Sequence, residues 1–460
     1  MQKSVNPVSI KVITLRRPAR DGGVRDKSVQ LGKQAFLMVH FFAPCYRFVM
    51  QTELDNFDTD TAFTVQNDGL IEALRLLSEQ ESVDLAAAFA AVPIDLPDKG
   101  TGERELLCDL AALVLGGAHR LDDALSFAHM DPPTPWLTWA MAVWNARLNQ
   151  NLLHPVTAPA ARLIEERTVD WLAPYFGMDG GHIVPGSTVA NLTAIWAARE
   201  LRGIDEVVAP NTAHISIEKS ARLLGLRFRP LPTDNEGRML AEAAVGLDRA
   251  CLVLVAGATS TGVIDPLRVA GSAAWTHVDA AWAGPLRLSH KHACLLDGIE
   301  HADSVAVSAH KWLFQPKESA LIFFRDAATA HSAISFGGAY LAAPNIGLLG
   351  SHGATAVPLF ALLWAWGRDG LASRLDRCMS AAEKFTAFVE DDHRFELLGR
   401  PETGVVVWRP RDKSVEDFGA ALPAGLASQT TVAGSPWLRC VAANPSVNIN
   451  AVIDAVRSII

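Results

Sequence analysis

The sequence predicts an α/β protein with a mostly parallel central sheet covered by helices, followed by a small α+β domain. Three observations support this fold class. Short apolar strands alternate with helical segments through the middle of the chain, which is the pattern of βα units. The tail instead holds strands near 404–408 and 437–441 and a final helix near 448–459. Of the 460 residues 49% are hydrophobic and 20% are charged, which is typical of a globular protein with a large core.

Helical spacing of apolar residues marks the N-terminal part of the chain. We expect helices at 70–77, 83–92, 105–115, 136–148 and 160–175. Pro93, Pro97 and Gly100 end the second of these helices, because proline and glycine interrupt helical structure.

The alternation of strands and helices begins with a helix at 188–201. The expected strands are 206–209, 227–231, 251–256, 276–278, 304–307 and 320–324, with a further helix at 215–224. Two more helices are expected after Gly338, at 356–368 and 371–389.

The charge balance argues against nucleic-acid and membrane partners. The formal net charge is −9, so the chain has no basic field that would attract polyanions. A membrane-spanning helix needs roughly 18 consecutive apolar residues, and no segment reaches that length. The apolar run at 35–50 is interrupted by His40, Pro44 and Arg47. We interpret this run as a buried or interface segment.

The six cysteines are scattered and form no CxxC pair. This usage predicts reduced, buried thiols in a cytoplasmic protein rather than a disulfide framework. We expect no metal site.

A lysine between two apolar strands is the first candidate for chemistry. Lys311 lies in the segment SVAVSAHKWLFQPKESALIFFRD (304–326), with Trp312 beside it. An isolated lysine is usually a surface charge. A lysine crowded between buried strands loses its proton more readily, as a Schiff-base lysine must. Upstream, Asp279 ends a short strand in HVDAAW (277–282). Such a pair is the arrangement expected for pyridoxal phosphate, where the aspartate keeps the pyridine nitrogen protonated.

The segments HVDAAW (277–282) and GIEHADSVAVSAHKW (298–312) resemble the group II pyridoxal-phosphate decarboxylases. This family includes glutamate, aromatic-amino-acid and diaminobutyrate decarboxylases, and the resemblance runs from about residue 96 to residue 460. It implies the fold type I architecture of pyridoxal-phosphate-dependent transferases and an internal aldimine at Lys311. It further implies that Ala281 packs under the cofactor ring and that His310 contacts the phosphate.

The expected domains follow from this resemblance. Residues 1–100 would form an N-terminal arm, disordered at its start, and helices. Residues 101–345 would form the large cofactor-binding domain, and residues 346–460 the small C-terminal domain.

The segment PGSTVANL (185–192) is the candidate phosphate cradle. Gly186 lets the backbone come close to a ligand, and Ser187 and Thr188 stand where a helix begins. Backbone N–H groups and the helix dipole favour a phosphate at that point. An ordinary serine or threonine N-cap would look the same. The family has a comparable glycine- and serine-rich turn, although Val189 stands where an acidic residue is common.

Two further residues are assigned by the resemblance. The segment AHISIEKS (213–220) is similar to the family's His-x-Ser-x-x-Lys pattern, which implies that His214 stacks on the pyridine ring. The loop GATSTGVIDP (257–266) follows an apolar strand, and ligands of open α/β sheets bind at the carboxyl ends of strands. In this loop Thr259 matches a family threonine near the cofactor, whereas Ala258 replaces another.

A lone tyrosine flanked by glycines completes the set of candidates. Tyr340 lies in FGGAYL (336–341), where the glycines suit a mobile lid. Decarboxylases of the family carry a lid tyrosine here, which protonates the α-carbon after carbon dioxide leaves. An exposed loop aromatic is the alternative. One departure concerns the family's Ser-Arg-Arg, which is SHG (351–353) in this chain and leaves substrate choice open.

We therefore expect a pyridoxal-phosphate-dependent decarboxylase that converts an L-amino acid into the amine and carbon dioxide. The resemblance implies a homodimer with shared active sites and a small-molecule amino acid substrate, without nucleic-acid or membrane partners. An aldehyde synthase, aminotransferase or lyase on the same fold is one alternative. A non-catalytic degenerate homologue is the other, and the presence of Lys311, Asp279 and His214 argues against it.

Overall fold

The computed structural model describes residues 61–79, 83–338, 341 and 344–459. The chain divides into two compact units, residues 1–75 and 76–460. The described part of the first unit holds a short 3-10 helix (Thr61–Phe63) and the start of α1 (Asn67–Ser78). The apolar run at 35–50 lies outside the described residues. The domain boundaries expected at residues 100 and 345 stay predictions.

The second unit is built on a central sheet in which the described residues form seven strands. These are β1 (Gly180–Val184), β2 (Glu206–Pro210), β3 (Arg227–Leu231), β4 (Ala250–Val255), β5 (Trp275–Asp279), β6 (Ser304–Ser308) and β7 (Ala320–Phe324). Their order across the sheet is β1-β7-β6-β5-β4-β2-β3. The pairs from β6 to β3 are parallel, whereas β7 is antiparallel to both neighbours. Because of this, β1 runs in the same direction as β6. The expectation of a mostly parallel sheet is confirmed.

Both faces of this sheet are buried. In β4, Cys251 and Val253 pack into one apolar cluster, while Leu252 and Leu254 pack into another. Alternate side chains of a strand point to opposite faces, so each cluster covers one face. This explains why the strands read as nearly continuous apolar runs in the sequence.

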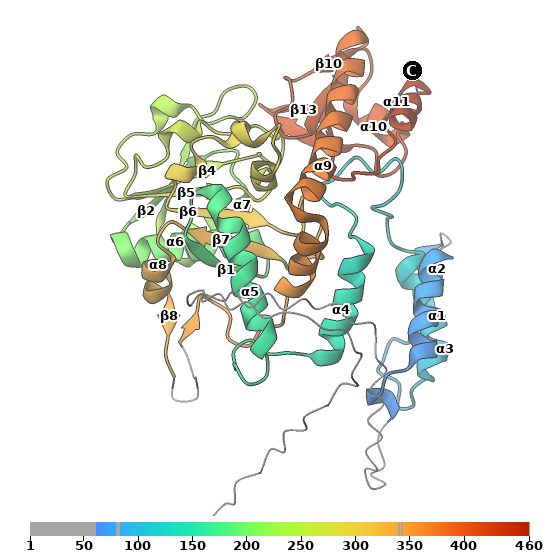
Figure 1. Ribbon diagram of the computed structural model, residues 1–460. Helices are drawn as coiled ribbons and strands as arrows, with labels where there is room; N and C mark the ends of the chain where they lie inside the picture. Colours follow the sequence, from blue (N-terminus) through green and yellow to red (C-terminus); the bar gives the residue numbers. More distant parts are fainter. Residues whose placement is uncertain (1–60, 80–82, 339–340, 342–343, 460) are drawn as a thin grey trace, which may run out of the picture. The chain divides into compact units, whose positions relative to one another are not determined.

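Helices supply the two covering layers (Figure 1). The helices described between residues 76 and 338 of the second unit are α2 (Leu85–Ala90), α3 (Glu103–Leu110), α4 (Trp136–Leu148), α5 (Pro159–Leu172), α6 (Ser187–Arg202), α7 (Ile215–Leu223) and α8 (Ala327–Ala333). A π-helical turn (Ala111–Leu115) extends α3. Helix α6 lies against β5, β6 and β7, and α5 lies against β1. The helices expected at 136–148 and 188–201 are therefore present.

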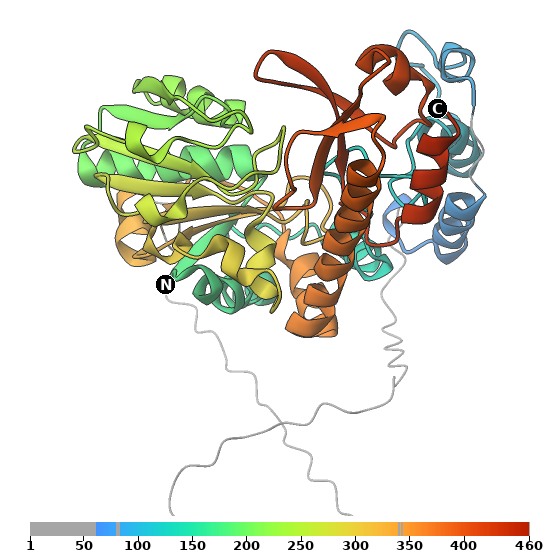
Figure 2. The same cartoon turned by 90° about the horizontal axis from the view of Figure 1, so that it is seen from above.

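A second, antiparallel sheet forms the C-terminal part (Figure 2). Its order is β10 (Phe395–Leu397), β11 (Val405–Pro410), β13 (Ser435–Val441) and β12 (Ser428–Val432). The helices beside it are α9 (Ala356–Asp391), α10 (Val415–Ala421) and α11 (Ile449–Arg457). Element α9 comprises two helices that meet at a kink at Gly367, where φ is 61°, so the two helices expected at 356–368 and 371–389 are present. A two-stranded ribbon pairs β8 (Ser335–Phe336) with β9 (Asn345–Ile346).

Two tryptophans join the large sheet to the C-terminal sheet. The rings of Trp282 and Trp312 stack with centroids 4.0 Å apart. The indole N–H of Trp282 donates to the carbonyl of Thr403 at 2.8 Å, and that of Trp312 donates to the carbonyl of Ala442 at 3.1 Å. Gly257 has a φ of 95°, and a Cβ there would lie 2.8 Å from the Trp282 ring. A glycine is therefore required beside this stack.

The cysteine expectation is only partly right. Cys251, Cys378 and Cys440 are buried and free, but Cys108 and Cys294 are exposed. Cys108 is exposed because α3 buries none of its residues. Cys45 lies outside the described residues. Within the described ranges, no helix is both long and apolar enough to cross a membrane.

Candidate active site

The carboxyl ends of four strands meet at one edge of the central sheet. Strand β1 leads into Gly186, and β4 leads into the loop at 257–266. Strand β5 ends at Asp279, and β6 is followed by Lys311. Open α/β sheets bind their ligands at this edge. The fold therefore brings together residues that are far apart in the sequence.

The first group of residues surrounds the start of α6. Gly186 has a φ of 96°, a conformation that side-chain-bearing residues rarely adopt, and it precedes Ser187. The Ser187 hydroxyl lies 3.0 Å from that of Ser308, which lies 3.2 Å from His310 Nε2. Among the described side chains none caps the N-terminus of α6. The first N–H groups of the helix are thus available for an anion.

His310 is held as a neutral ring. Burial, together with the charges of Lys317 and Lys311, lowers the pKa of His310 to about 4. Its Nδ1 lies 3.1 Å from the carbonyl of Ser319, so Nδ1–H donates there and Nε2 accepts from Ser308. His310 therefore orients the hydroxyl groups without adding a positive charge at neutral pH.

The second group centres on a buried carboxylate. Asp279 is 5% exposed and accepts from Asn191 Nδ2 at 2.9 Å and from the backbone N–H of Ala281 at 3.1 Å. The amide of Asn191 also donates to the Ser216 hydroxyl at 2.9 Å. Its oxygen lies 2.9 Å from His277 Nε2, which must donate because the amide oxygen only accepts. Both N–H groups and the oxygen of the Asn191 amide are therefore hydrogen-bonded.

The same chain of hydrogen bonds fixes His214 at the start of α7. The backbone N–H of Ser216 donates to His214 Nδ1 at 3.2 Å, and the two side chains are 2.8 Å apart. Nδ1 is thus an acceptor, and the proton of the neutral ring resides on Nε2. Burial lowers the pKa of His214, while the nearby charge of Asp279 opposes the shift. His214 and Asp279 are connected through Ser216 and Asn191.

Lys311 lies within reach of these charges. Burial lowers the pKa of Lys311, and the charges of Asp279 and Asp131 oppose that shift. A lysine whose proton is more easily lost is the form that attacks an aldehyde. The position predicted from its two apolar strands has the physical property that this chemistry needs.

Two further charged residues, to which the sequence motifs assign no role, act on this group. Arg439 of β13 donates through Nη1 to the carbonyl of Thr259 at 2.7 Å. Its Nε is buried without a hydrogen-bond partner in the described structure. Asp131, in the proline-rich loop before α4, forms an ion pair with Lys317. Asp131 raises the pKa of Arg439 against the lowering effect of burial, so the two charges are close enough to interact.

The sequence candidates are not all placed equally. Gly186, Ser187, Asp279 and His310 lie in the groups described above. Three other candidates do not lie in these groups. Thr188 and Thr259 have exposed side chains, and Tyr340 lies outside the described residues.

The sequence motifs contain three polar residues that the sequence alone assigns no role: Asn191, Ser216 and Ser308. The available signal was a polar residue at an otherwise apolar position of a helix or strand, because buried polar groups are uncommon without partners.

The arrangement offers three separate holds for pyridoxal phosphate. The uncapped start of α6 behind Gly186 suits the phosphate. The buried carboxylate of Asp279 suits a protonated ring nitrogen, and Lys311 suits the aldehyde. The orphaned Nε of Arg439 adds a donor for a carboxylate. The residues present therefore fit this cofactor.

Comparison with known proteins gives the family. The model of the pyridoxal-dependent decarboxylase conserved domain matches residues 87–411. L-2,4-diaminobutyrate decarboxylase of Rhizobium meliloti (strain 1021) is 30% identical over 349 residues, 68% of this chain and 70% of that protein. Aspartate 1-decarboxylase of Aliivibrio fischeri (strain ATCC 700601 / ES114) is 28% identical over 343 residues, 61% of this chain and 62% of that protein.

A solved structure agrees in fold. The crystal structure of Oryza sativa TDC with PLP and tryptamine superimposes with a TM-score of 0.77 at 20% identity, covering 86% of this chain and 98% of that one. At this identity the likeness speaks for the fold. Together with the matched domain, it confirms the expected fold class, cofactor and enzyme class. The chain belongs to the pyridoxal-dependent decarboxylase family and is a pyridoxal-phosphate-dependent carboxy-lyase.

Proposed function

We propose that this enzyme removes the α-carboxyl group of a small L-amino acid as carbon dioxide and releases the amine, with Lys311 holding the cofactor. The observation that carries this proposal is Lys311 itself, half-buried, with a lowered pKa, beside Asp279 and Arg439. In the overall reaction the bond between Cα and the carboxylate breaks, carbon dioxide leaves, and Cα takes a proton. When bound, pyridoxal phosphate supplies the electron sink for the pair left by the broken bond.

The residues of the chain have distinct proposed tasks. Asp279 holds the ring nitrogen protonated, and Ala281 packs beneath the ring. Gly186, Ser187 and Thr188 would surround the phosphate, His310 would contact it, and Thr259 would lie near the cofactor. His214 stacks on the ring, where its Nε2–H is available to the substrate carboxylate. Tyr340, outside the described residues, stays the predicted proton donor to Cα.

Arg439 is proposed to bind a carboxylate of the substrate. Its guanidinium is anchored by one bond to the carbonyl of Thr259, and its Nε keeps an unused donor. Buried donors without partners are rare in folded proteins, and a substrate carboxylate would satisfy this one. Because Arg439 belongs to β13, binding would involve the C-terminal sheet as well as the large sheet.

We further propose that the side chain of the substrate is basic. Lys311 and Arg439 already supply positive charge, and the two charges interact. Asp131 is the acidic group of the proline-rich loop that acts on both of these cations. Its present partner, Lys317, has a side chain that is 60% exposed and can move aside. A substrate ammonium would then take its place.

The enzyme is also proposed to act as a homodimer. Helix α4 is apolar on most of its surface, yet Trp136 is 70% and Trp144 is 60% exposed. Helix α9, which packs beside α4, exposes 73% of Trp364. Helices that are apolar all round are normally buried, and exposed aromatic patches mark interaction surfaces. A second copy of the chain is the partner that the family resemblance implies.

The cytoplasmic location stays a prediction from composition.

Replacement of the lysine tests the proposed reaction. The Lys311→Ala variant, mixed with pyridoxal phosphate, should lack the absorbance band that the wild type shows with its cofactor bound through the lysine. Its rate of carbon dioxide release from a panel of L-amino acids should fall roughly a thousandfold or more. The exposed Lys384→Ala on α9 serves as the matched control. Absorbance spectra and product analysis provide the measurements. Aldehyde and ammonia in place of amine and carbon dioxide would contradict simple decarboxylation, and a protein that binds no cofactor would contradict any catalytic role.

Removal of the central amide tests the proposed hold on the ring nitrogen. Asn191→Ala leaves one oxygen of the buried Asp279 without its donor, so cofactor affinity should weaken about tenfold to a hundredfold. Thr193→Val is the control, because this buried hydroxyl on the same helix has no hydrogen-bond partner in the described structure. Titration with pyridoxal phosphate, followed by absorbance, measures the effect. Equal affinity in both variants would show that Asn191 does not position Asp279.

Substrate preference tests the role of Asp131. With L-2,4-diaminobutyrate as the probe, Asp131→Asn should lower kcat/KM at least about tenfold, because a charge-assisted hydrogen bond is lost. Lys317→Gln should leave that value unchanged or raise it, since it removes a competing cation. L-aspartate is the comparison substrate. If aspartate is the preferred substrate and Lys317→Gln abolishes its turnover, the side chain recognised is acidic instead.

Charged substitutions on α4 test the dimer. The double variant Trp136→Glu, Trp144→Glu should sediment as a monomer, because buried charges without partners destabilise an interface. Leu223→Glu on α7 is the matched control, since Leu223 is also exposed. Sedimentation velocity of both variants gives the answer. A double variant that stays dimeric would place the interface elsewhere.

A further inference from the structure

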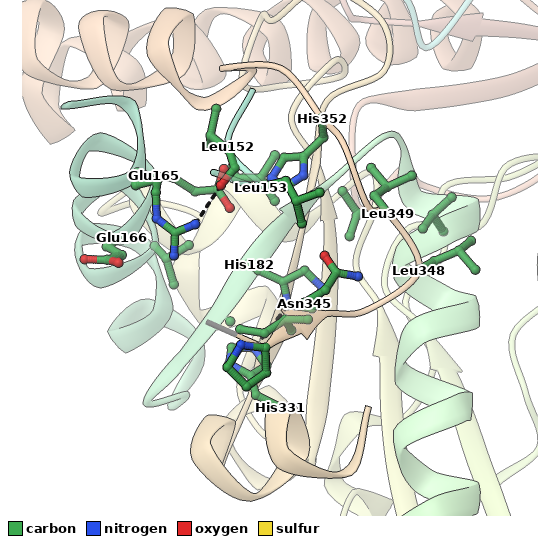
Figure 3. A pocket seen from close by; sticks show the side chains of 18 residues that line it. Leu152, Leu153, Glu165, Glu166, His182, His331, Asn345, Leu348, Leu349 and His352 are labelled. Carbon is green, nitrogen blue, oxygen red and sulfur yellow. Dashed lines mark hydrogen bonds between the residues drawn. The ribbon is translucent and has the colours of Figure 1, made fainter. Parts of the chain in front are cut away.

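A cavity lies apart from the residues proposed to hold the cofactor. It measures about 290 Å³ and is lined mainly by residues of α5, β1 and the segment at 344–352 (Figure 3). None of the residues to which we give a role in the reaction lines it. Much of its wall is apolar, and it is contributed by Leu152, Leu153, Val169, Val189, Leu348 and Leu349. A space of this size exceeds the share of a single water molecule about tenfold and approaches that of small-ligand sites.

One carboxylate oxygen in this cavity lacks a hydrogen-bond partner. Glu165 of α5 has its Oε2 buried without a hydrogen bond to any described group. Its side chain lies beside the ring of His352 in Figure 3, but no ion pair forms between them. Burial raises the pKa of Glu165, while the charge of His352, a hydrogen bond from the backbone N–H of Ile183 and the charge of Arg162 oppose this. Arg162 donates through Nη1 to the carbonyl of Leu152 at 2.6 Å. An unpaired acceptor at this depth is costly unless a ligand supplies the donor.

Two imidazoles of the cavity, His182 and His331, do not supply that donor as cations. His182 of β1 and His331 of α8 are hydrogen-bonded, with Nδ1 and Nε2 3.1 Å apart. Burial lowers the pKa of His182 to about 3, with the two neighbouring imidazoles adding to the effect, and burial also lowers the pKa of His331. His352 directs its Nδ1–H to the carbonyl of Gly350 at 2.9 Å. The His182–His331 pair is therefore neutral near pH 7.

The position of the cavity connects it to the cofactor cradle. Val184 and Val189 line it, and these residues flank the turn that holds Gly186 and Ser187. Pro344, on another wall, follows the sequence segment that contains Tyr340. A ligand here would touch the end of β1 and the start of α6 without entering the reaction site.

We propose that this cavity binds a small primary amine with an apolar body, whose ammonium group is received by Glu165. The apolar wall matches the body, and the unpaired carboxylate oxygen matches a single cationic donor. An anion is disfavoured, because Glu165 would repel it. Amines of this kind are the product class of the proposed function, on which this part of the inference rests. The site would let the product inhibit the enzyme from outside the reaction centre.

Calorimetry with n-butylamine tests this site directly. Holoenzyme treated with borohydride is used, because reduction fixes the cofactor to Lys311 and prevents amine exchange there. Wild type should bind n-butylamine, and Glu165→Gln should bind it at least about tenfold more weakly. Asp170→Asn, an exposed carboxylate on the same helix, should bind as wild type. Leu348→Trp places a larger side chain at the exposed side of the cavity and should abolish binding of n-butylamine. n-Butanol and butyrate should not compete.

Three results would overturn the proposal. These are the absence of binding to wild type, equal binding to Glu165→Gln, or equal loss in Asp170→Asn. Kinetics adds a second readout: the part of amine inhibition that substrate cannot relieve should disappear in Glu165→Gln, while the competitive part remains. Failure of the proposed function is recognised separately, because mass spectrometry would then show no cofactor fixed to Lys311 whatever n-butylamine does.

Discussion

The buried carboxylate of Asp279 is the constraint around which the site is built. A carboxylate at this depth is stable only if its oxygens accept hydrogen bonds, and Asn191 and the N–H of Ala281 provide them. Since Asn191 also bonds Ser216 and His277, the start of α7 and the end of β5 are locked to α6. The tautomer of His214 follows from the same chain of bonds. One buried charge thus determines the orientation of groups on three elements.

The stack of Trp282 on Trp312 extends this order to the C-terminal sheet. Each tryptophan lies close in sequence to a key residue, Asp279 or Lys311, and each donates to a backbone carbonyl of the C-terminal part. The C-terminal sheet in turn supplies Arg439, which donates a hydrogen bond to the loop after β4. Aromatic stacking and paired indole N–H groups make this junction rigid. The proposed substrate site therefore depends on both sheets being fixed relative to each other.

Much of the fold could be predicted because apolar periodicity and chain breakers coincide. The helix 136–148 and the strands 227–231 and 320–324 have the expected bounds. Strand β1 was missed because GGHIV contains two glycines and a histidine. Strand β12 was missed because SQTTV is polar, and its hairpin turns at Ala433 and Gly434, both with positive φ.

The site was only partly predictable for a related reason. Motifs identify residues that carry chemistry, but Arg439 and Asp131 act through partners far along the chain, and a linear pattern does not encode such contacts. The imidazoles show what the contacts add. Burial lowers the pKa of His214, His277 and His310 alike, so near pH 7 these rings orient neighbours rather than carry charge. In the proposed function, Lys311 and Arg439 would then meet a substrate carboxylate without competition from imidazolium ions, and Asp131 would be left to select the side chain.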